Sequence, residues 1–297
     1  MNGGQHLYLF EGIDPAPSES HKSDDGALIA GCAQPRRLPE KDEALSDNPA
    51  DWYFDFIYGR RMTWKQKASA RQWAGIIHQH HQRFRFERIC MDPNGGGTLI
   101  KRELISTRQL INGVDTDVTP IGDQVDGPHL VGRGEFILHI FKRGDPGVEA
   151  LWPELPGDDN LNDALYSVCK DAVDHGLWAW PMPIEEWLLD RKDDVARWPE
   201  ERVWALKNLD AATVQMKNIV VATKEDGTFA FTKRNARQFS SIGKKDFVSA
   251  SMYCYAAFLM WLRSDEWRSR VAPEDADQFS GWGGQGWGNA SHGATAR

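Results

Sequence analysis

The chain has 297 residues, a formal net charge of −8 at pH 7 and a hydrophobic content of 41%. This length can bury a sizeable core, as one large domain or two small ones. The negative charge argues against a protein that coats nucleic acid by bulk electrostatics, although it permits an enzyme that cuts DNA at an acidic metal cluster.

The sequence predicts neither a membrane span nor a signal peptide. No run approaches the roughly 20 apolar residues that a membrane span needs, and the N-terminus lacks the basic and apolar parts of a signal peptide. The cysteines have no CxxC spacing, and three of the four sit in apolar runs. We therefore expect a protein that is not secreted, with buried thiols in a reducing compartment and no structural zinc site.

The first predicted strand, Leu7–Asp14, ends abruptly in an aspartate that is followed by Pro15. Large and β-branched side chains favour a buried strand, and proline ends it because proline cannot donate a ladder hydrogen bond. The same pattern recurs at Phe86–Asp92, again with proline next. We expect Asp14 and Asp92 to stand at the ends of two strands and to converge on one metal site.

Three further elements lie between these two strands. A turn signal at Asp24–Gly26 precedes a second short strand, Ala27–Ala33, and the aromatic run Asp51–Met62 predicts a third. Thr63–Phe84 then changes to a helical period and leads into the strand that ends at Asp92. This order predicts an α/β fold with a mixed sheet, in which antiparallel hairpin strands and parallel strands are flanked by helices.

The middle of the chain is less regular. Thr98–Ile111 is predicted to be a helix, and Asp117–Ile121 is expected to be a short strand. Residues 122–199 are rich in Gly, Pro and Trp, and we interpret them as an inserted accessory region. Within this region Glu135–Phe141 is strand-like and Leu161–His175 is a helix candidate.

The C-terminal part contains the most apolar helix of the chain. Glu200–Asp210 is predicted to be helical, and Asp226-Gly227 is typical of a hairpin turn. Asp246 then precedes Phe247–Leu262, which has so few charges that it should be buried. Asp246 at its start lies where the helix dipole favours an anion.

Four blocks of sequence follow one another in order: Gly12–Ala16 (GIDPA), Ser23–Leu28 (SDDGAL), Cys90–Gly97 (CMDPNGGG) and Lys244–Ala250 (KKDFVSA). Because these blocks have this order and spacing, the chain resembles the ribonuclease H-like nuclease domain of the large terminase subunit of tailed bacteriophages. The resemblance spans the chain from Leu7 to Leu262 and is weakest over residues 122–199.

The resemblance implies that Asp14, Asp92 and Asp246 are the catalytic residues and metal ligands, with Asp24 or Asp25 as an accessory acid. It implies an endonuclease that cuts concatemeric double-stranded viral DNA during genome packaging, by two-metal phosphodiester hydrolysis with Mg or Mn ions. The implied partners are double-stranded DNA, a terminase ATPase domain, a small terminase subunit and a portal. The implied location is the cytoplasm of the bacterial host.

One departure from the family concerns ATP. A complete large terminase begins with an ATPase domain that carries a GxxxxGK[ST] loop, and Gly243-Lys244-Lys245 lacks both the Ser/Thr and the upstream glycine. We therefore expect an excised nuclease domain, or a product that works beside a separate motor. Residues 1–265 are expected to form the nuclease domain, and residues 266–297 a flexible tail.

Basic side chains near the predicted element ends could contact a DNA backbone. An ordinary solvated surface explains them almost equally well. These residues are Arg60, Arg61, Lys233, Arg234, Arg237, Lys244 and Lys245.

Each acid also has an ordinary structural explanation. Asp14 and Asp92 could simply cap strands, Asp246 could cap its helix, and Asp163 is a rival third acid in the accessory region. His78, His80 and His81 are better explained as a partly exposed helix face than as a metal site.

Three other classes of function remain open. One is another ribonuclease H-like enzyme, such as a junction resolvase or a transposase, although a transposase would usually carry a glutamate on the closing helix, where Asp246 stands here. The second is a non-catalytic module that docks DNA or a portal. A glycoside hydrolase, which would need no metal, is a distant third.

Overall fold

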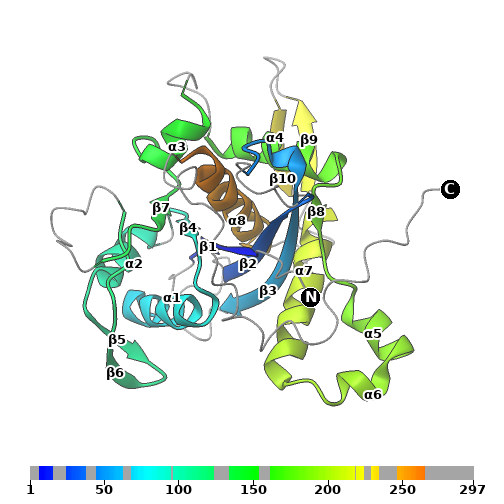
Figure 1. Cartoon of the computed structure of the whole chain (residues 1–297), viewed down its shortest axis with the longest axis horizontal. Helices are drawn as coiled ribbons and strands as arrows, with labels where there is room; N and C mark the ends of the chain where they lie inside the picture. The colour runs from blue at the N-terminus through cyan, green and yellow to red at the C-terminus, as the bar shows by residue number, and fades with distance from the viewer. Residues whose placement is uncertain are drawn as a thin grey trace.

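A computed structural model describes residues 7–15, 25–37, 45–62, 68–94, 96–123, 134–153, 161–217, 219–223, 229–233 and 246–264. Its centre is a six-stranded sheet with the strand order β7-β4-β1-β2-β3-β8 (Figure 1). The strands are β1 (Tyr8–Asp14), β2 (Gly26–Pro35), β3 (Trp52–Met62), β4 (Arg88–Met91), β7 (Leu138–Ile140) and β8 (Trp178–Ala179).

The direction of the strands identifies the fold class. β2 runs antiparallel to its two neighbours, β1 and β3. The pairs β1–β4, β4–β7 and β3–β8 are parallel. The predicted mixed sheet, with antiparallel hairpin strands and parallel strands, is therefore confirmed.

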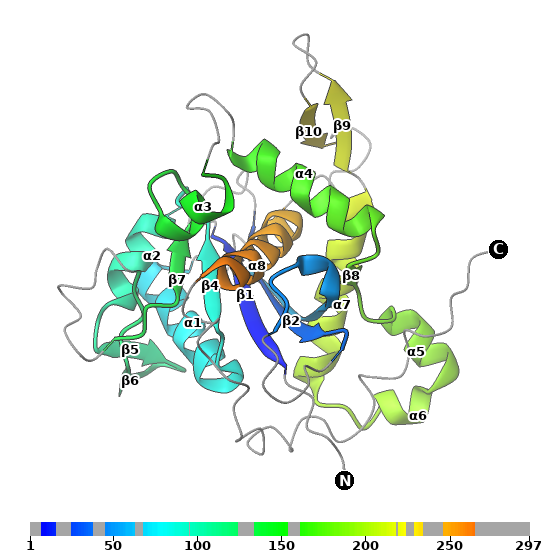
Figure 2. The same ribbon diagram turned by 45° about the horizontal axis from the view of Figure 1, so that its top comes forward.

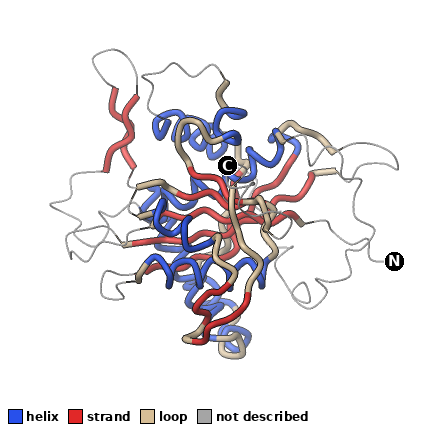
Figure 3. Tube along the Cα trace, turned by 90° about the vertical axis from the view of Figure 1, so that its left-hand side faces the viewer, coloured by secondary structure: helices blue, strands red, loops and turns tan. Residues whose placement is uncertain are grey.

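Helices cover both sides of this sheet (Figure 3). The helix α8 (Asp246–Arg263) lies across β1 and β2 on one face, with α4 (Leu161–Asp174) next to it, and α1 (Ala70–Phe84) covers the other face (Figure 2). The remaining described elements are η1 (Pro49–Asp51), α2 (Gly97–Leu104), β5 (Arg108–Ile111), β6 (Val114–Asp117), α3 (Pro146–Leu151), α5 (Ile184–Asp190), α6 (Lys192–Val195), α7 (Glu200–Lys217), β9 (Ile219–Thr223) and β10 (Phe229–Lys233).

The sheet has two apolar faces because successive side chains of a strand point to opposite sides. Even-numbered residues of β1 and β4, such as Phe10 and Cys90, pack with the side chains of α8. Odd-numbered residues, such as Ile13 and Met91, pack with Trp73 of α1. The strands β1, β2 and β4 are therefore buried on both faces, which explains why they are largely apolar runs, whereas β3 alternates buried and half-buried residues.

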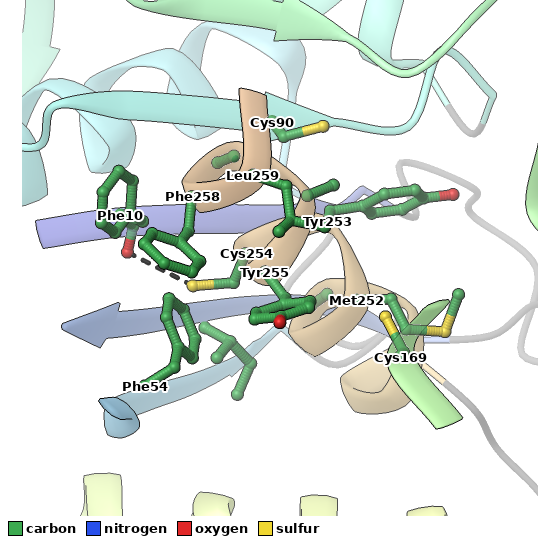
Figure 4. Packing of buried hydrophobic residues seen from close by; sticks show 14 of the residues in the cluster. Phe10, Phe54, Cys90, Cys169, Met252, Tyr253, Cys254, Tyr255, Phe258 and Leu259 are labelled. Carbon is green, nitrogen blue, oxygen red and sulfur yellow. Dashed lines mark hydrogen bonds between the residues drawn. The ribbon is translucent and has the colours of Figure 1, made fainter. Parts of the chain in front are cut away.

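The predicted buried helix is confirmed as α8, which is buried at every position from Asp246 to Leu262. It approaches β1 closely at Gly12, where a Cβ atom would lie 2.0 Å from the Ala250 carbonyl oxygen and 2.1 Å from the Cys254 nitrogen. Figure 4 shows Cys254 beside Phe10, to whose carbonyl its Sγ donates a hydrogen bond of 3.4 Å. Even so, no helix in the described parts of the chain is long and apolar enough to cross a membrane.

The predicted helix Thr98–Ile111 is wrong over its second half. The helix α2 ends at Leu104, and Arg108–Ile111 forms β5, which pairs with β6. Asn112 and Gly113 join the two strands with positive φ angles of 52° and 82°. Asn-Gly favours this kind of two-residue hairpin turn, and that local preference outweighs the helical pattern. The strand expected at Asp117–Ile121 is likewise displaced, since β6 ends at Asp117.

The three histidines of α1 are buried, so the expectation of a partly exposed helix face is wrong. His80 Nδ1 lies 2.8 Å from Glu11 Oε1, and His81 Nε2 lies 2.7 Å from Glu135 Oε2. His78 Nε2 lies 3.3 Å from the Leu104 carbonyl oxygen. Each ring has its own polar partner, which is how a buried polar side chain avoids the cost of desolvation.

The region 122–199 contributes to the central sheet. The strand-like run Glu135–Phe141 contains β7, and the expected helix Leu161–His175 is α4. β7 pairs with β4 and β8 pairs with β3, so both lie in the same sheet as β1. The division of the chain at residues 122, 199 and 265 stays a prediction.

Replacing Gly12 by alanine should lower the free energy of unfolding by about 3 kcal/mol, because the added Cβ meets backbone atoms of α8 that cannot rotate away. Urea unfolding followed by circular dichroism measures the change. Gly59→Ala is the matched control, since its nearest neighbour is the Asn208 side chain at 3.2 Å. Equal losses for the two variants would contradict the close packing of α8 on β1.

His78 should make the protein less stable in mild acid. Burial lowers the pKa of His78 from 6.5 to about 4. Between these values the unfolded chain binds the proton and the folded chain does not, so stability is complete above the unfolded pKa and is lost as the pH falls. From pH 7 to pH 5 this loss is about 2 kcal/mol.

The measurement is urea unfolding of the wild type and His78→Gln at pH 7 and pH 5. The wild type should lose more stability than the variant, and the control His175→Gln, at an exposed histidine, should behave as the wild type. If His78→Gln loses as much stability between pH 7 and pH 5 as the wild type does, the loss is due to other titratable groups.

Candidate active site

Asp14 and Asp92 lie side by side at the ends of two parallel strands. Ile13 is paired with Met91, and the next residues along β1 and β4 are Asp14 and Asp92. The pairing continues to this point, because the Asp92 amide donates to the Ile13 carbonyl oxygen at 3.1 Å. Since neighbouring strands are about 4.8 Å apart, the two carboxylates start from adjacent positions.

Because side chains alternate between the two faces of a strand, the side chains of Asp14 and Asp92 both lie on the face that α8 covers. Asp14 is in phase with Phe10 on β1, and Asp92 is in phase with Cys90 on β4, and both of these pack against α8. The two acids are also only partly buried, whereas Asp25 and Asp246 are 3% and 2% exposed. A ligand from solvent can therefore reach Asp14 and Asp92.

Two neutral donors hold the Asp92 carboxylate. The Asn94 amide donates to Oδ1 at 2.7 Å, and the Tyr253 hydroxyl donates to Oδ2 at 2.8 Å. The first donor belongs to the turn after β4, and the second comes from α8. Burial, followed by the charges of Asp92 and Asp14, raises the pKa of Tyr253 well above its ordinary value, so this hydroxyl stays protonated.

Asp246 and Asp25 form a second, buried pair of acids. The Asp25 amide donates to Asp246 Oδ2 at 3.2 Å, which joins the residue before β2 to the first residue of α8. The Asp25 carboxylate is paired with Arg61, whose Nη2 and Nε lie 2.5 Å and 2.7 Å from Oδ2. Asp25 therefore has a full positive charge as its partner.

The sheet and α8 together gather these acids at one edge. Arg61 is paired with Ala27, and Ala27 is paired with Asp14, so Arg61, Asp14 and Asp92 follow one row across the sheet. On α8 the corresponding stripe is Asp246, Ser249 and Tyr253, which share a face at i,i+3 and i,i+4 spacing. The structure thus brings Asp14, Asp25, Asp92 and Asp246 to the same edge.

Two tyrosines at this edge were not expected from the sequence. Tyr253 contacts Asp92, and Tyr166 of α4 hydrogen-bonds with Ser249 and lies close enough to Asp14 for that charge to raise its pKa, after the larger effect of burial. A tyrosine inside an apolar helix is typical of a core residue, so neither position carried a signal in the sequence. Their roles depend on contacts between segments far apart in the chain.

The chemistry of these donors matches a hard cation. The carboxylates offer only oxygen, which suits magnesium or manganese. Cys90 and Cys254 are buried, and burial raises the pKa of both thiols well above its ordinary value, so neither supplies a thiolate. However, no three His, Cys, Asp or Glu side chains of the described ranges converge closely enough to hold a metal ion. The acids share an edge without forming a closed three-ligand site.

The basic residues expected to contact DNA have different positions. Arg61 is engaged by Asp25, and Arg60 follows the opposite face of β3, in phase with Tyr58. Lys233 is the last residue of β10. Four of the expected basic residues and one acid lie outside the described residues: Arg234, Arg237, Lys244, Lys245 and Asp24. The rival acid Asp163 is in the first turn of α4.

No protein-family model and no curated protein matches this sequence. Solved structures do resemble the chain. The large terminase nuclease of thermophilic phage G20c is 12% identical, with a TM-score of 0.41, over 86% of this chain and 89% of that one. A second G20c structure, with bound magnesium, is 11% identical over 86% and 88%, with a TM-score of 0.42.

The nuclease domain of the large terminase subunit of bacterial virus Sf6 is 10% identical, with a TM-score of 0.43, over 85% of this chain and 89% of that one. The resemblance expected from the sequence blocks is thus also found among solved structures. At such low sequence identity, the roles of individual residues cannot be inferred from these structures. The candidate site is therefore described from the geometry of this chain alone.

Truncating Arg61 to alanine should lower the free energy of unfolding by about 2 kcal/mol, because it leaves the buried Asp25 carboxylate without its charged partner. Chemical unfolding at pH 7 measures the loss. The control is Arg71→Ala, which breaks an ion pair with Asp115 in which both side chains are about half exposed. A loss no larger than that of the control would contradict the structural importance of the Arg61–Asp25 pair.

Proposed function

We propose that this protein is a metal-dependent DNA endonuclease that cuts concatemeric double-stranded viral DNA during genome packaging. The observation that carries the proposal is the pair Asp14 and Asp92, side by side at the carboxyl ends of parallel strands and reachable from solvent. Carboxylates on rigid strand ends are suitable ligands for the cations that hydrolyse phosphodiesters.

In this proposal Asp14 and Asp92 hold divalent magnesium or manganese between them, and Asp246 is the third ligand from α8. Two bound ions would supply an activated water and would stabilise the leaving 3′ oxygen. The chain's own groups orient these ligands. Asn94 and Tyr253 hold Asp92, and the Asp25 amide holds Asp246.

Asp25 has a supporting role in this assignment. Its carboxylate is paired with Arg61, so it is less available to a metal than Asp14 or Asp92. We assign Asp25 to the placement of Asp246, through its amide, and we leave Asp24 as an accessory acid. The basic residues Lys244 and Lys245, next to Asp246 in the sequence, are proposed to contact the DNA backbone, together with Arg60, Lys233, Arg234 and Arg237.

The substrate and partners follow from the sequence blocks. Their resemblance to terminase nucleases supports viral DNA as the substrate, and an ATPase domain, a small terminase subunit and a portal as partners in the host cytoplasm. The proposed nuclease unit comprises residues 1–265, and the tail comprises residues 266–297.

A second candidate function is a docking module without catalysis. It is favoured by one observation, that the acids of the described residues do not converge as three ligands. Catalysis that depends on a partner would have the same appearance. Metal-dependent cutting by the isolated protein would exclude the docking module.

The test is cleavage of supercoiled plasmid in magnesium, in manganese and in EDTA. We expect nicking and linear product with either metal and none in EDTA, and we expect Asp92→Ala to lower the rate at least about 100-fold, because a direct ligand is lost. Asp117→Ala is the matched control, since Asp117 is 90% exposed on the outer hairpin. Cutting that survives both EDTA and Asp92→Ala would overturn the proposal.

A further inference from the structure

Tyr253 is joined to Asp92 across the interior of the protein. The two residues are 161 positions apart, and the hydroxyl of Tyr253 lies 2.8 Å from Asp92 Oδ2. The tyrosine is 3% exposed, and its ring packs at 5.3 Å from that of Phe141. Packing therefore holds the phenol in place, so the hydrogen bond does not depend on a mobile side chain.

This hydrogen bond completes the restraint on Asp92. The Asn94 amide already fixes Oδ1 from within the same turn, at 2.7 Å. A second donor, from a different element, fixes Oδ2 and removes the remaining rotation of the carboxylate. An acid that is held at both oxygens has less orientational freedom to lose when it binds a ligand.

The donor is neutral, and this distinguishes Asp92 from Asp25. Arg61 brings a positive charge to Asp25 and so offsets the charge of that carboxylate. Tyr253 orients Asp92 through a phenol hydroxyl, a neutral donor, and so does not cancel the charge of the carboxylate. Asp92 therefore keeps its attraction for a cation while its geometry is fixed.

We propose that Tyr253 is the positioning residue of the candidate active site, and that it holds the Asp92 carboxylate in the orientation that binds a divalent cation. The inference rests on the proposed function, since it names the residue that prepares a metal ligand for that reaction. Hydrogen-bond partners of metal ligands typically change metal affinity by about 10- to 100-fold when they are removed.

The matched variants are Tyr253→Phe and Tyr255→Phe, which remove one hydroxyl each from buried tyrosines of the same helix. Figure 4 shows the two rings leaving α8 in different directions. Tyr255 packs against Phe54, Trp178 and Phe258, on the side of β3. Any effect of Tyr253→Phe that Tyr255→Phe lacks is then due to the contact with Asp92.

Calorimetric titration of the full chain with Mn²⁺ is the first measurement. We expect Tyr253→Phe to raise the dissociation constant at least about 10-fold and Tyr255→Phe to leave it unchanged. In plasmid cleavage the half-saturating metal concentration should rise by the same factor, while the rate at saturating metal stays within about threefold. Equal Mn²⁺ affinities for the two variants would overturn the inference and leave the proposed function intact.

A double-mutant cycle in the metal-free protein tests the contact independently of catalysis. Tyr253→Phe and Asp92→Ala, singly and together, are compared by their urea midpoints, with Tyr255→Phe and Asp92→Ala as the control cycle. The midpoint shifts should be non-additive for Tyr253 and additive for Tyr255. Additive shifts for Tyr253 would refute its action through Asp92. If the wild type binds no Mn²⁺, the proposed function fails and the metal-positioning role of Tyr253 fails with it, whereas Mn²⁺ binding that Tyr253→Phe leaves unchanged overturns the inference alone.

Discussion

The contact between α8 and β1 at Gly12 is the constraint on which the rest of the structure depends. A Cβ atom at this position would lie 2.0 Å from the Ala250 carbonyl oxygen, so the helix can approach only because the strand has a glycine there. This approach sets the height of α8 above the sheet, and therefore the distances from Tyr253 to Asp92 and from Asp246 to the Asp25 amide. Asp14 and Asp92 come from the sheet and Asp246 comes from α8, so the packing of α8 on the sheet fixes the positions of these acids relative to one another.

Four carboxylates at one edge would repel one another if all carried full charge in the same surroundings. The structure gives them different surroundings instead. Asp25 is buried and is matched by the guanidinium of Arg61. Asp92 is partly exposed and is held by the neutral Asn94 amide and Tyr253 hydroxyl. At this edge the charge of Asp25 is thus offset by Arg61, whereas Asp92 is held by neutral donors and is suited to attract a cation.

Much of the fold was predictable from the sequence, since short apolar runs, aspartates at strand ends and one nearly uncharged helix are local signals. The paired ends of β1 and β4 and the burial of α8 follow from them. The Asn112-Gly113 turn was also visible locally, but a helical pattern around it obscured the signal. The buried histidines and Tyr253 could not be predicted in the same way. Their partners, such as Glu11 for His80 and Asp92 for Tyr253, lie on distant segments, and only the packed structure brings them together.

The large sequence separation between the acids and their partners on α8 also determines when the site can exist during protein synthesis. The contacts that complete it join positions 161 and 221 residues apart. The ribosome makes β1, β2 and β4 early, and it makes α8 last among the described elements. Until α8 has emerged, the sheet has an open apolar face at Phe10 and Cys90, and Asp92 has no tyrosine above it. A nascent chain therefore contains most of the acids before their partners on α8 exist. The complete site can form only after α8 has been synthesised.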